Sequence, residues 1–143
     1  MSVGKILATK GKAVVTAQAS QSLHDASLML ADHRIGAVVV TGADGSVDGI
    51  LSERDIVKAV ARGGAGALKD TVGDHMTRRV VTCVAASSIN QVMEVMTAGK
   101  FRHVPVVLDG RLDGMISIGD VVKHRLAELE HESQSLREYI TAS

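Results

Sequence analysis

Hydrophobic and polar positions follow the same order twice along this chain of 143 residues. Apolar residues spaced by three and four positions, as at Leu23, Ala26 and Leu30, predict a helix with one buried face. Short apolar runs before and after this helix predict strands. Each half of the chain is therefore predicted to form the order β-α-β-β-α.

Local signals set the limits of these elements. Ser22-x-x-Asp25 and Ser88-x-x-Gln91 are capping sequences, so a helix is expected to start after each serine. Strands are expected at the apolar segments Val14–Thr16, Gly36–Val40, Asp48–Ser52, Val80–Thr82, His103–Val107 and Asp113–Ser117. The last strand of each half is expected to run directly into a second helix.

A ten-residue segment shows the repetition most clearly. Residues 49–58 read GILSERDIVK, and residues 114–123 read GMISIGDVVK. The earlier elements of the two halves align at a shift of 66 residues, and one extra residue in the first turn reduces the shift to 65. Matches in this order over nearly the whole chain indicate an internal duplication.

Each repeated unit has too small a core to be stable alone. Two units packed sheet against sheet about a pseudo-twofold axis would solve this problem. We therefore predict an α+β fold of tandem repeats with a C-terminal helix. The predicted division is repeat 1 at residues 3–62, a Gly-rich linker at 63–71, repeat 2 at 72–125 and a helical tail at 126–143.

The tail carries a seam of mostly apolar residues with heptad spacing. The seam consists of Val122, Leu126, Leu129, Ser133, Leu136 and Ile140. It covers fewer than three heptads, so two interpretations stay open. The tail helix packs on its own domain, or it joins two molecules as a homodimer.

Composition narrows the function. The formal net charge is zero, which argues against nucleic-acid binding and against a polybasic membrane anchor. No apolar run is long enough to span a membrane, and no signal peptide is visible. The single cysteine, Cys83, suits a reducing cytosol, so a cytoplasmic protein is expected. The six histidines show no metal-ligand spacing.

The two β-α-β-β-α units, each ending in Gly-h-h-Ser-x-x-Asp-h-h (h apolar), resemble a cystathionine β-synthase (CBS) domain pair of the small stand-alone bacterial type. The segments RHVPVV, residues 102–107, and MTRRVVT, residues 76–82, are also similar to that family. The resemblance implies that an adenosine nucleotide binds in clefts between the repeats, with AMP favoured over ADP, ATP and NAD(H). It further implies a non-catalytic regulatory module that forms homodimers and reports energy or redox state to an unidentified protein partner.

Ser52 and Ser117 lie where a strand is predicted to turn into a helix, so free backbone N–H groups and the positive end of the helix dipole gather there. Such a junction readily holds a phosphate, with the serine hydroxyl as a further donor. Asp55 and Asp120 lie one turn further along, where a carboxylate suits the 2′- and 3′-hydroxyls of a ribose. A capping box explains the same Ser and Asp without any ligand, and the two interpretations are compatible.

The two junctions differ in charge. The first adds Arg54, a planar cation suited to phosphate, whereas the second has Ile118 and then Gly119. The nearby candidates for positive charge at the second junction are Arg78, Arg79, Arg102 and His103. We therefore predict two non-equivalent sites, with the nucleotide held more tightly where Arg or His side chains from both repeats converge. A solvated surface position is the alternative interpretation of these arginines.

Aliphatic walls are expected around the adenine, since the chain has one Phe, one Tyr and no Trp. The candidate walls are Val14, Val38, Val80, Val104, Ile116 and Ile118, although core packing alone explains such residues. Pro105 lacks an N–H and therefore one ladder hydrogen bond. The resemblance implies that its strand lines the adenine slot, where an unpaired backbone edge would read the base; an empty edge strand is the alternative. Weaker candidates at the cleft mouth are Lys12, Thr16 and Thr82.

Two rival functions stay open at this point. The first is a structural interaction protein whose clefts stay empty and which acts through its dimer surface. The second, less favoured, is an enzyme that uses the carboxylates of the SERD segment, residues 52–55.

Overall fold

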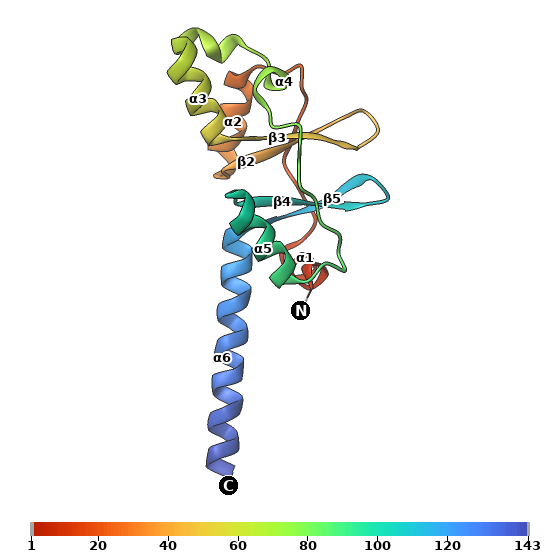
Figure 1. The fold of residues 1–143 in the computed structure, drawn as a ribbon, viewed down its shortest axis with the longest axis vertical. Coiled ribbons are helices and arrows are strands. Elements are labelled where there is room, and N and C mark those ends of the chain that lie inside the picture. Colours follow the sequence, from red (N-terminus) through yellow and green to blue (C-terminus); the bar gives the residue numbers. More distant parts are fainter. Residues whose placement is uncertain (1, 143) are drawn as a thin grey trace.

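The computed structural model describes residues 2–142 and shows two α+β halves (Figure 1). The first half contains α1 (Val3–Lys10), β1 (Thr16–Ala17), α2 (Leu23–His33), β2 (Ala37–Thr41), β3 (Val47–Ser52) and α3 (Glu53–Gly63). A short 3-10 helix, Gly64–Lys69, follows α3. The second half contains α4 (Val72–His75), α5 (Ile89–Gly99), β4 (His103–Leu108), β5 (Arg111–Ser117) and α6 (Ile118–Ala142). The predicted fold class and the tandem repeats are confirmed.

Two small sheets form the centre of the molecule. β2 pairs in parallel with β1 and antiparallel with β3, and β4 pairs antiparallel with β5. The two hairpins lie one above the other (Figure 1), and a bridge between Ser46 and Arg111 links them. Core 1 lies among α2, α3, β2 and β3, and core 2 lies among α5, the start of α6, β4 and β5. Each repeat thus buries its own helices on the outer face of its own sheet.

The first strand of each repeat differs from the prediction. β1 covers only Thr16–Ala17, and Val80–Thr82 forms no strand. In repeat 2, Cys83 instead forms a single parallel bridge to Val106 of β4. The apolar runs did not predict these short pairings. Strand pairing depends on where the chain meets β2 or β4, and not only on how apolar the segment is.

Helices α1 and α4 are exchanged between the two repeats: α1 packs into core 2, and α4 packs into core 1. The exchanged segments bury Val3, Ile6 and Leu7 in core 2, and Val72 and Met76 in core 1. The backbone contacts are related by the same pseudo-symmetry: the N–H of Val3 donates to the carbonyl of Ser87 at 2.9 Å, and the N–H of Val72 donates to that of Gln21 at 2.7 Å. This exchange ties the repeats into one unit, and hydrophobic periodicity did not predict it.

The exchange explains why glycine recurs in the repeated ten-residue segment. A Cβ atom at Gly49 would lie 2.7 Å from Sδ of Met76 and 2.9 Å from the carbonyl oxygen of Thr77. A Cβ atom at Gly114 would lie 2.8 Å from Cδ2 of Leu7. The exchanged segments therefore approach β3 and β5 closely. At Gly49 a backbone atom would block a Cβ atom, whereas at Gly114 only the flexible end of Leu7 would meet it.

Helix α6 runs without a break from Ile118 to Ala142, across the predicted boundary at residue 126. Its first turns pack on repeat 2 through the buried Val121, and the rest projects from the body (Figure 1). The segment predicted as a linker is largely a 3-10 helix that buries Ala67 in core 1. The division into domains stays a prediction. Within residues 2–142, no helix is both long and apolar enough to cross a lipid bilayer.

Candidate functional site

The two predicted strand-to-helix junctions form with the same geometry. We call residues Ser52–Asp55 corner 1 and residues Ser117–Asp120 corner 2. At corner 1, the N–H of the serine donates to Oδ2 of the aspartate at 2.8 Å, and the N–H of the aspartate donates to Oγ of the serine at 3.3 Å. The matching distances at corner 2 are 2.9 and 3.1 Å. Both corners are therefore capping boxes, as one of the two interpretations expected.

Corner 1 opens into a cavity of about 350 Å³ between the repeats. The predicted site residues that line it are Ser52, Arg54, Asp55, Arg79, Val80, Arg102 and His103. They come from the start of α3, from the segment after α4 and from the start of β4, so both repeats contribute. The structure thus brings Arg and His side chains of the two repeats together at corner 1.

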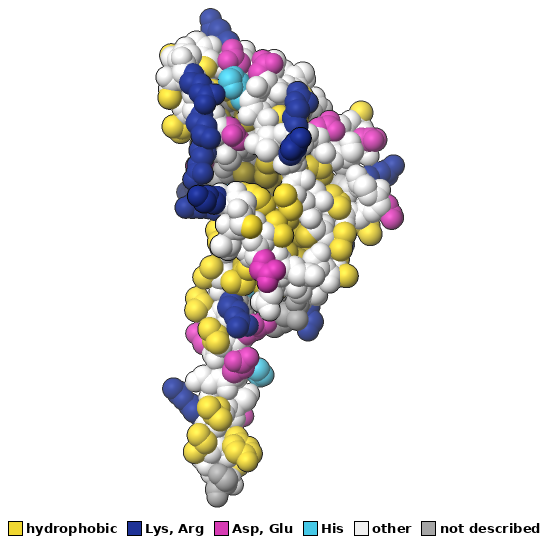
Figure 2. All heavy atoms as spheres, viewed as in Figure 1, with side chains coloured by type: hydrophobic (Ala, Val, Ile, Leu, Met, Phe, Trp, Pro, Cys, Tyr) yellow, Lys and Arg dark blue, Asp and Glu magenta, His cyan; other side chains and the backbone are white. Residues whose placement is uncertain are grey.

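The wall of this cavity carries four cationic side chains and the two carboxylates of Glu53 and Asp55. Its cationic side chains are Arg54, Arg79, Lys100 and Arg102. None of the four forms an ion pair within the part of the chain that the structure describes. Figure 2 shows Lys and Arg side chains where the two halves of the molecule meet. An anionic ligand would offset charge that the fold itself leaves unpaired.

Asp55 keeps acceptor capacity. Its Oδ2 accepts two hydrogen bonds from Ser52, from the N–H at 2.8 Å and from Oγ at 3.1 Å. Its Oδ1 accepts no hydrogen bond from residues 2–142. An ionised carboxylate has about four lone-pair positions, so Asp55 has room for the hydroxyl groups of a ligand.

Corner 2 is filled by Lys10, at the end of α1. Nζ of Lys10 lies 2.6 Å from Oδ2 of Asp120 and donates to the carbonyl of Met115 at 2.8 Å. The carboxylate that corresponds to Asp55 therefore already has a cationic partner from within the protein.

These charges shift two pKa values. Burial raises the pKa of Asp120, but hydrogen bonds from Lys10 and Ser117 outweigh burial and hold this pKa below its ordinary value. Burial lowers the pKa of His103, and the positive charge of Lys10 lowers it further. His103 is therefore neutral at pH 7, and it offers the cavity a hydrogen-bonding group rather than a further cation.

Several predicted apolar walls lie in the two cores and do not line the cavity. Val38 is buried in core 1, and Val104 and Ile116 are buried in core 2. Neighbouring residues of a strand face opposite sides of the sheet, so the cavity receives Ala37 and His103 instead. Core packing explains why these aliphatic residues are present.

Pro105 does not present a free backbone edge. It is fully buried in β4, opposite Met115 of β5. Its carbonyl accepts the N–H of Cys83 at 3.0 Å. This carbonyl is therefore not free to accept a hydrogen bond from a base, because Cys83, in the chain that leads into α5, already donates to it.

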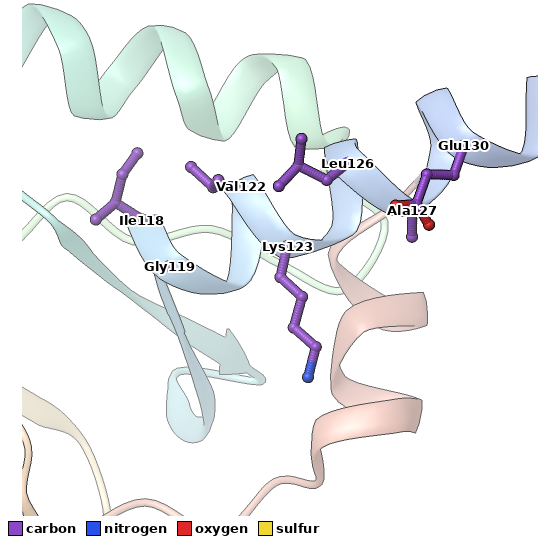
Figure 3. Close-up of a pocket in the computed structure, with 7 residues that line it drawn as sticks. All are labelled: Ile118, Gly119, Val122, Lys123, Leu126, Ala127 and Glu130. Atoms are coloured by element: carbon purple, nitrogen blue, oxygen red, sulfur yellow. The ribbon is translucent and has the colours of Figure 1, made fainter. Parts of the chain in front are cut away.

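The remaining predicted residues also lie outside this cavity. They are Lys12, Val14, Thr16 and Thr82, together with Ile118 at the start of α6. Lys12 pairs with Asp113 at 3.3 Å, on the β5 hairpin. Ile118 lines a shallow groove along α6 (Figure 3).

Several residues at the corners were not predicted. Lys100 and Phe101 line the cavity just before β4, so an aromatic ring contributes where only aliphatic walls were expected. Lys10 was overlooked although a signal existed. Residues 2–10 read SVGKILATK and residues 71–79 read TVGDHMTRR, an alignment that pairs Lys10 with Arg79.

Comparison with known proteins agrees with this architecture. The family model for the CBS domain matches residues 3–62 and 72–127, which covers both repeats. The chain therefore belongs to the CBS-domain family and carries two copies of the domain.

Solved structures and a curated relative support the same assignment. The CBS-domain containing protein ATU1752 from Agrobacterium tumefaciens has a TM-score of 0.85 and 54% identity, over 87% of this chain and 99% of that chain. The CBS domain pair of protein MJ0100, solved in complex with 5′-methylthioadenosine and S-adenosyl-L-methionine, has a TM-score of 0.80 and 27% identity, over 90% of this chain and 98% of that chain. The mitochondrial CBS domain-containing protein CBSX3 from Arabidopsis thaliana is 31% identical over 146 residues, 96% of this chain and 71% of its own length.

Proposed function

We propose that the cavity at corner 1 binds an adenosine nucleotide, with AMP favoured over ADP, ATP and NAD(H). One observation carries this proposal: the cavity joins a Ser-x-x-Asp corner to arginines that have no ion pair among the described residues. Asp55 would accept hydrogen bonds from the two ribose hydroxyls. Arg54, Arg79 and Arg102 would bind the phosphate oxygens.

The size of the cavity favours a mononucleotide. Its volume of about 350 Å³ lies toward the lower end of the usual range for ligand pockets, about 300–1,000 Å³. A dinucleotide such as NAD(H) would have to extend beyond this cavity into solvent.

The ligands of MJ0100 support the adenosine part of the proposal. Both 5′-methylthioadenosine and S-adenosyl-L-methionine contain adenosine, and neither contains a phosphate. The arginines at corner 1 of this chain add a feature that suits phosphate, so we propose that it prefers a nucleotide to a nucleoside.

We also propose that each chain binds one nucleotide, at corner 1. At corner 2 the ammonium group of Lys10 already contacts the carboxylate that would receive the ribose. A ligand at corner 2 would first have to displace this contact.

We propose that the protein is a non-catalytic regulatory module of the cytoplasm that acts on a protein partner. A nucleotide at corner 1 would contact the start of α3 in repeat 1 and the start of β4 in repeat 2. Binding would thereby favour one arrangement of the two repeats, and the partner would sense that arrangement. The alternative is an interaction protein whose cavity stays empty, which the exposed seam of α6 favours.

Isothermal titration calorimetry with AMP, ATP, NADH and adenosine tests the proposal. We expect one AMP per chain and weaker binding of adenosine, because adenosine lacks the phosphate. The Arg54→Ala, Arg79→Ala double variant should bind AMP roughly tenfold or more weakly, since hydrogen bonds to charged groups contribute about 1.5–3 kcal/mol.

Arg62→Ala is the matched control, because Arg62 also lies on α3 but does not line the cavity. This variant should bind AMP like the original chain. Absence of heat with all four ligands would overturn the nucleotide proposal and favour the interaction protein.

A further inference from the structure

The C-terminal half of α6 projects into solvent. Every residue from Leu129 to Ala142 is exposed, and Figure 1 shows this part of the helix extending away from both sheets. In proteins most helical stability comes from packing of an apolar face. The apolar residues of this segment are exposed on the body of their own chain, so an outside surface would add this packing.

Apolar residues of α6 face in two directions. One face packs on core 2 through Val121, which is fully buried. The other face begins at the shallow groove of Figure 3 and continues down the helix. Its apolar residues Val122, Leu126, Leu129 and Leu136 are between 48% and 60% exposed. Their heptad spacing, with Ser133 between the last two, is that of a coiled-coil seam.

We propose that this seam pairs with the seam of a second molecule, in parallel and in register, as a two-stranded coiled coil. The charges beside the seam decide the orientation. In a parallel pair, Arg125 lies near Glu130 of the second molecule, and Glu132 lies near its Arg137. Both contacts join opposite charges, and the twofold symmetry of the pair makes each contact twice.

An antiparallel pair with the same seam brings like charges together. It places Glu130 beside Glu130 of the second molecule, and it places Lys123 near Arg137. The charge pattern therefore fits the parallel pair and opposes the antiparallel one.

Light scattering on the full chain is the first test. We expect a dimer of a chain of 15.0 kDa, and a monomer would overturn the proposal. Leu129→Asp together with Leu136→Asp should shift the dimer to monomer, because both side chains would lie in the seam. A dimer that survives this double substitution would also overturn the proposal, since it would use another surface.

Cysteine cross-linking tests the orientation. Ser133→Cys in a Cys83→Ala background should form an intermolecular disulfide, because a parallel, in-register pair places the two seam positions face to face. An antiparallel pair would place Ser133 against Leu129 instead. Gln134→Cys, outside the seam, is the matched control and should remain uncrosslinked. A dimer that fails to cross-link at position 133, or that cross-links equally at position 134, would overturn the parallel register.

A charge exchange tests the flanking contacts. Glu132→Arg and Arg137→Glu should each weaken the dimer about tenfold, since each replaces two attractions by two repulsions. The double variant should restore the affinity, and failure to restore it would contradict this contact. Arg125 is less suitable for the test, because it also binds Glu128 of its own helix at 2.8 Å. None of these measurements involves a nucleotide, so they stand or fall separately from the function proposed for corner 1.

Discussion

Corners 1 and 2 have nearly the same hydrogen-bond geometry and different surroundings. Asp55 lines a cavity that has Arg79 on its wall, whereas Asp120 is bound by Lys10. Counted from Ser2 and Thr71, where the shift is 69 rather than 66 residues, Arg79 and Lys10 hold the same position. The contrast shows that duplication preserves the backbone frame of a site, whereas the side chains around that frame differ between the two copies.

The lengths of the exchanged helices explain the contrast. α1 has eight residues and carries Lys10 as far as corner 2. α4 has four residues, after which Thr77 and Ile50 exchange two backbone hydrogen bonds of 2.9 and 3.0 Å. This bridge ends the helix early and leaves Arg79 along the cavity wall.

The largest expected difference between the corners is in nucleotide affinity. Asp55→Ala should weaken AMP binding roughly tenfold or more, because it removes a charged acceptor worth about 1.5–3 kcal/mol. Asp120→Ala should leave the affinity nearly unchanged, because Asp120 does not line the cavity. Titration calorimetry on both variants measures this difference. Equal losses in the two variants would contradict the assignment of the ligand to corner 1.

The glycines beside the exchanged segments should differ in the stability cost of substitution. Gly49→Ala places a methyl group 2.9 Å from a backbone carbonyl, which cannot move aside easily. Gly114→Ala meets only the end of the flexible Leu7 side chain, at 2.8 Å. Overpacking costs about 1–3 kcal/mol, so we expect Gly49→Ala near the top of this range and Gly114→Ala near the bottom. Urea denaturation of both variants measures the costs, and the reverse order would refute the explanation.

Removal of the Lys10 ammonium group should make corner 2 resemble corner 1. Lys10→Met frees Asp120 from an ion pair that is partly exposed and therefore worth at most about 1 kcal/mol. We expect a weak second AMP per chain to appear in calorimetry at high ligand concentration. Lys12→Met is the matched control, since Lys12 pairs with Asp113 outside corner 2. A stoichiometry that stays at one in Lys10→Met would show that Lys10 is not what closes this corner.

The smallest expected effect is a pH dependence at corner 2. The pKa of Asp120 is below its ordinary value of 3.8 in the folded chain, so the unfolded chain binds the proton first as the pH falls. The contribution of Asp120 to the free energy of unfolding is therefore fully present above about pH 4–5. It is lost as the pH falls below the ordinary pKa of 3.8 toward the lower pKa of the folded chain. The difference in unfolding free energy between the original chain and Asp120→Asn should shrink between pH 7 and about pH 3. A difference that stays constant over this interval would contradict the role of the charge.

Short-range patterns predicted the frame of the candidate site well. Ser52 and Asp55 are three residues apart, and a capping box depends only on the backbone between them. The predicted apolar walls were less successful, because apolarity does not reveal which side of a strand faces a ligand. Val38 and Ala37 are adjacent, yet the first is in core 1 and the second lines the cavity.

The duplicated order of elements and the two capped corners follow from the sequence, because hydrophobic period and capping are properties of neighbouring residues. Which corner is open depends on contacts between distant segments. Lys10 and Asp120 are 110 residues apart, and they meet only because α1 packs into core 2 rather than against its own repeat. No pattern of neighbouring residues predicts such a contact, because only the packing of the exchanged helix α1 brings the two charges together.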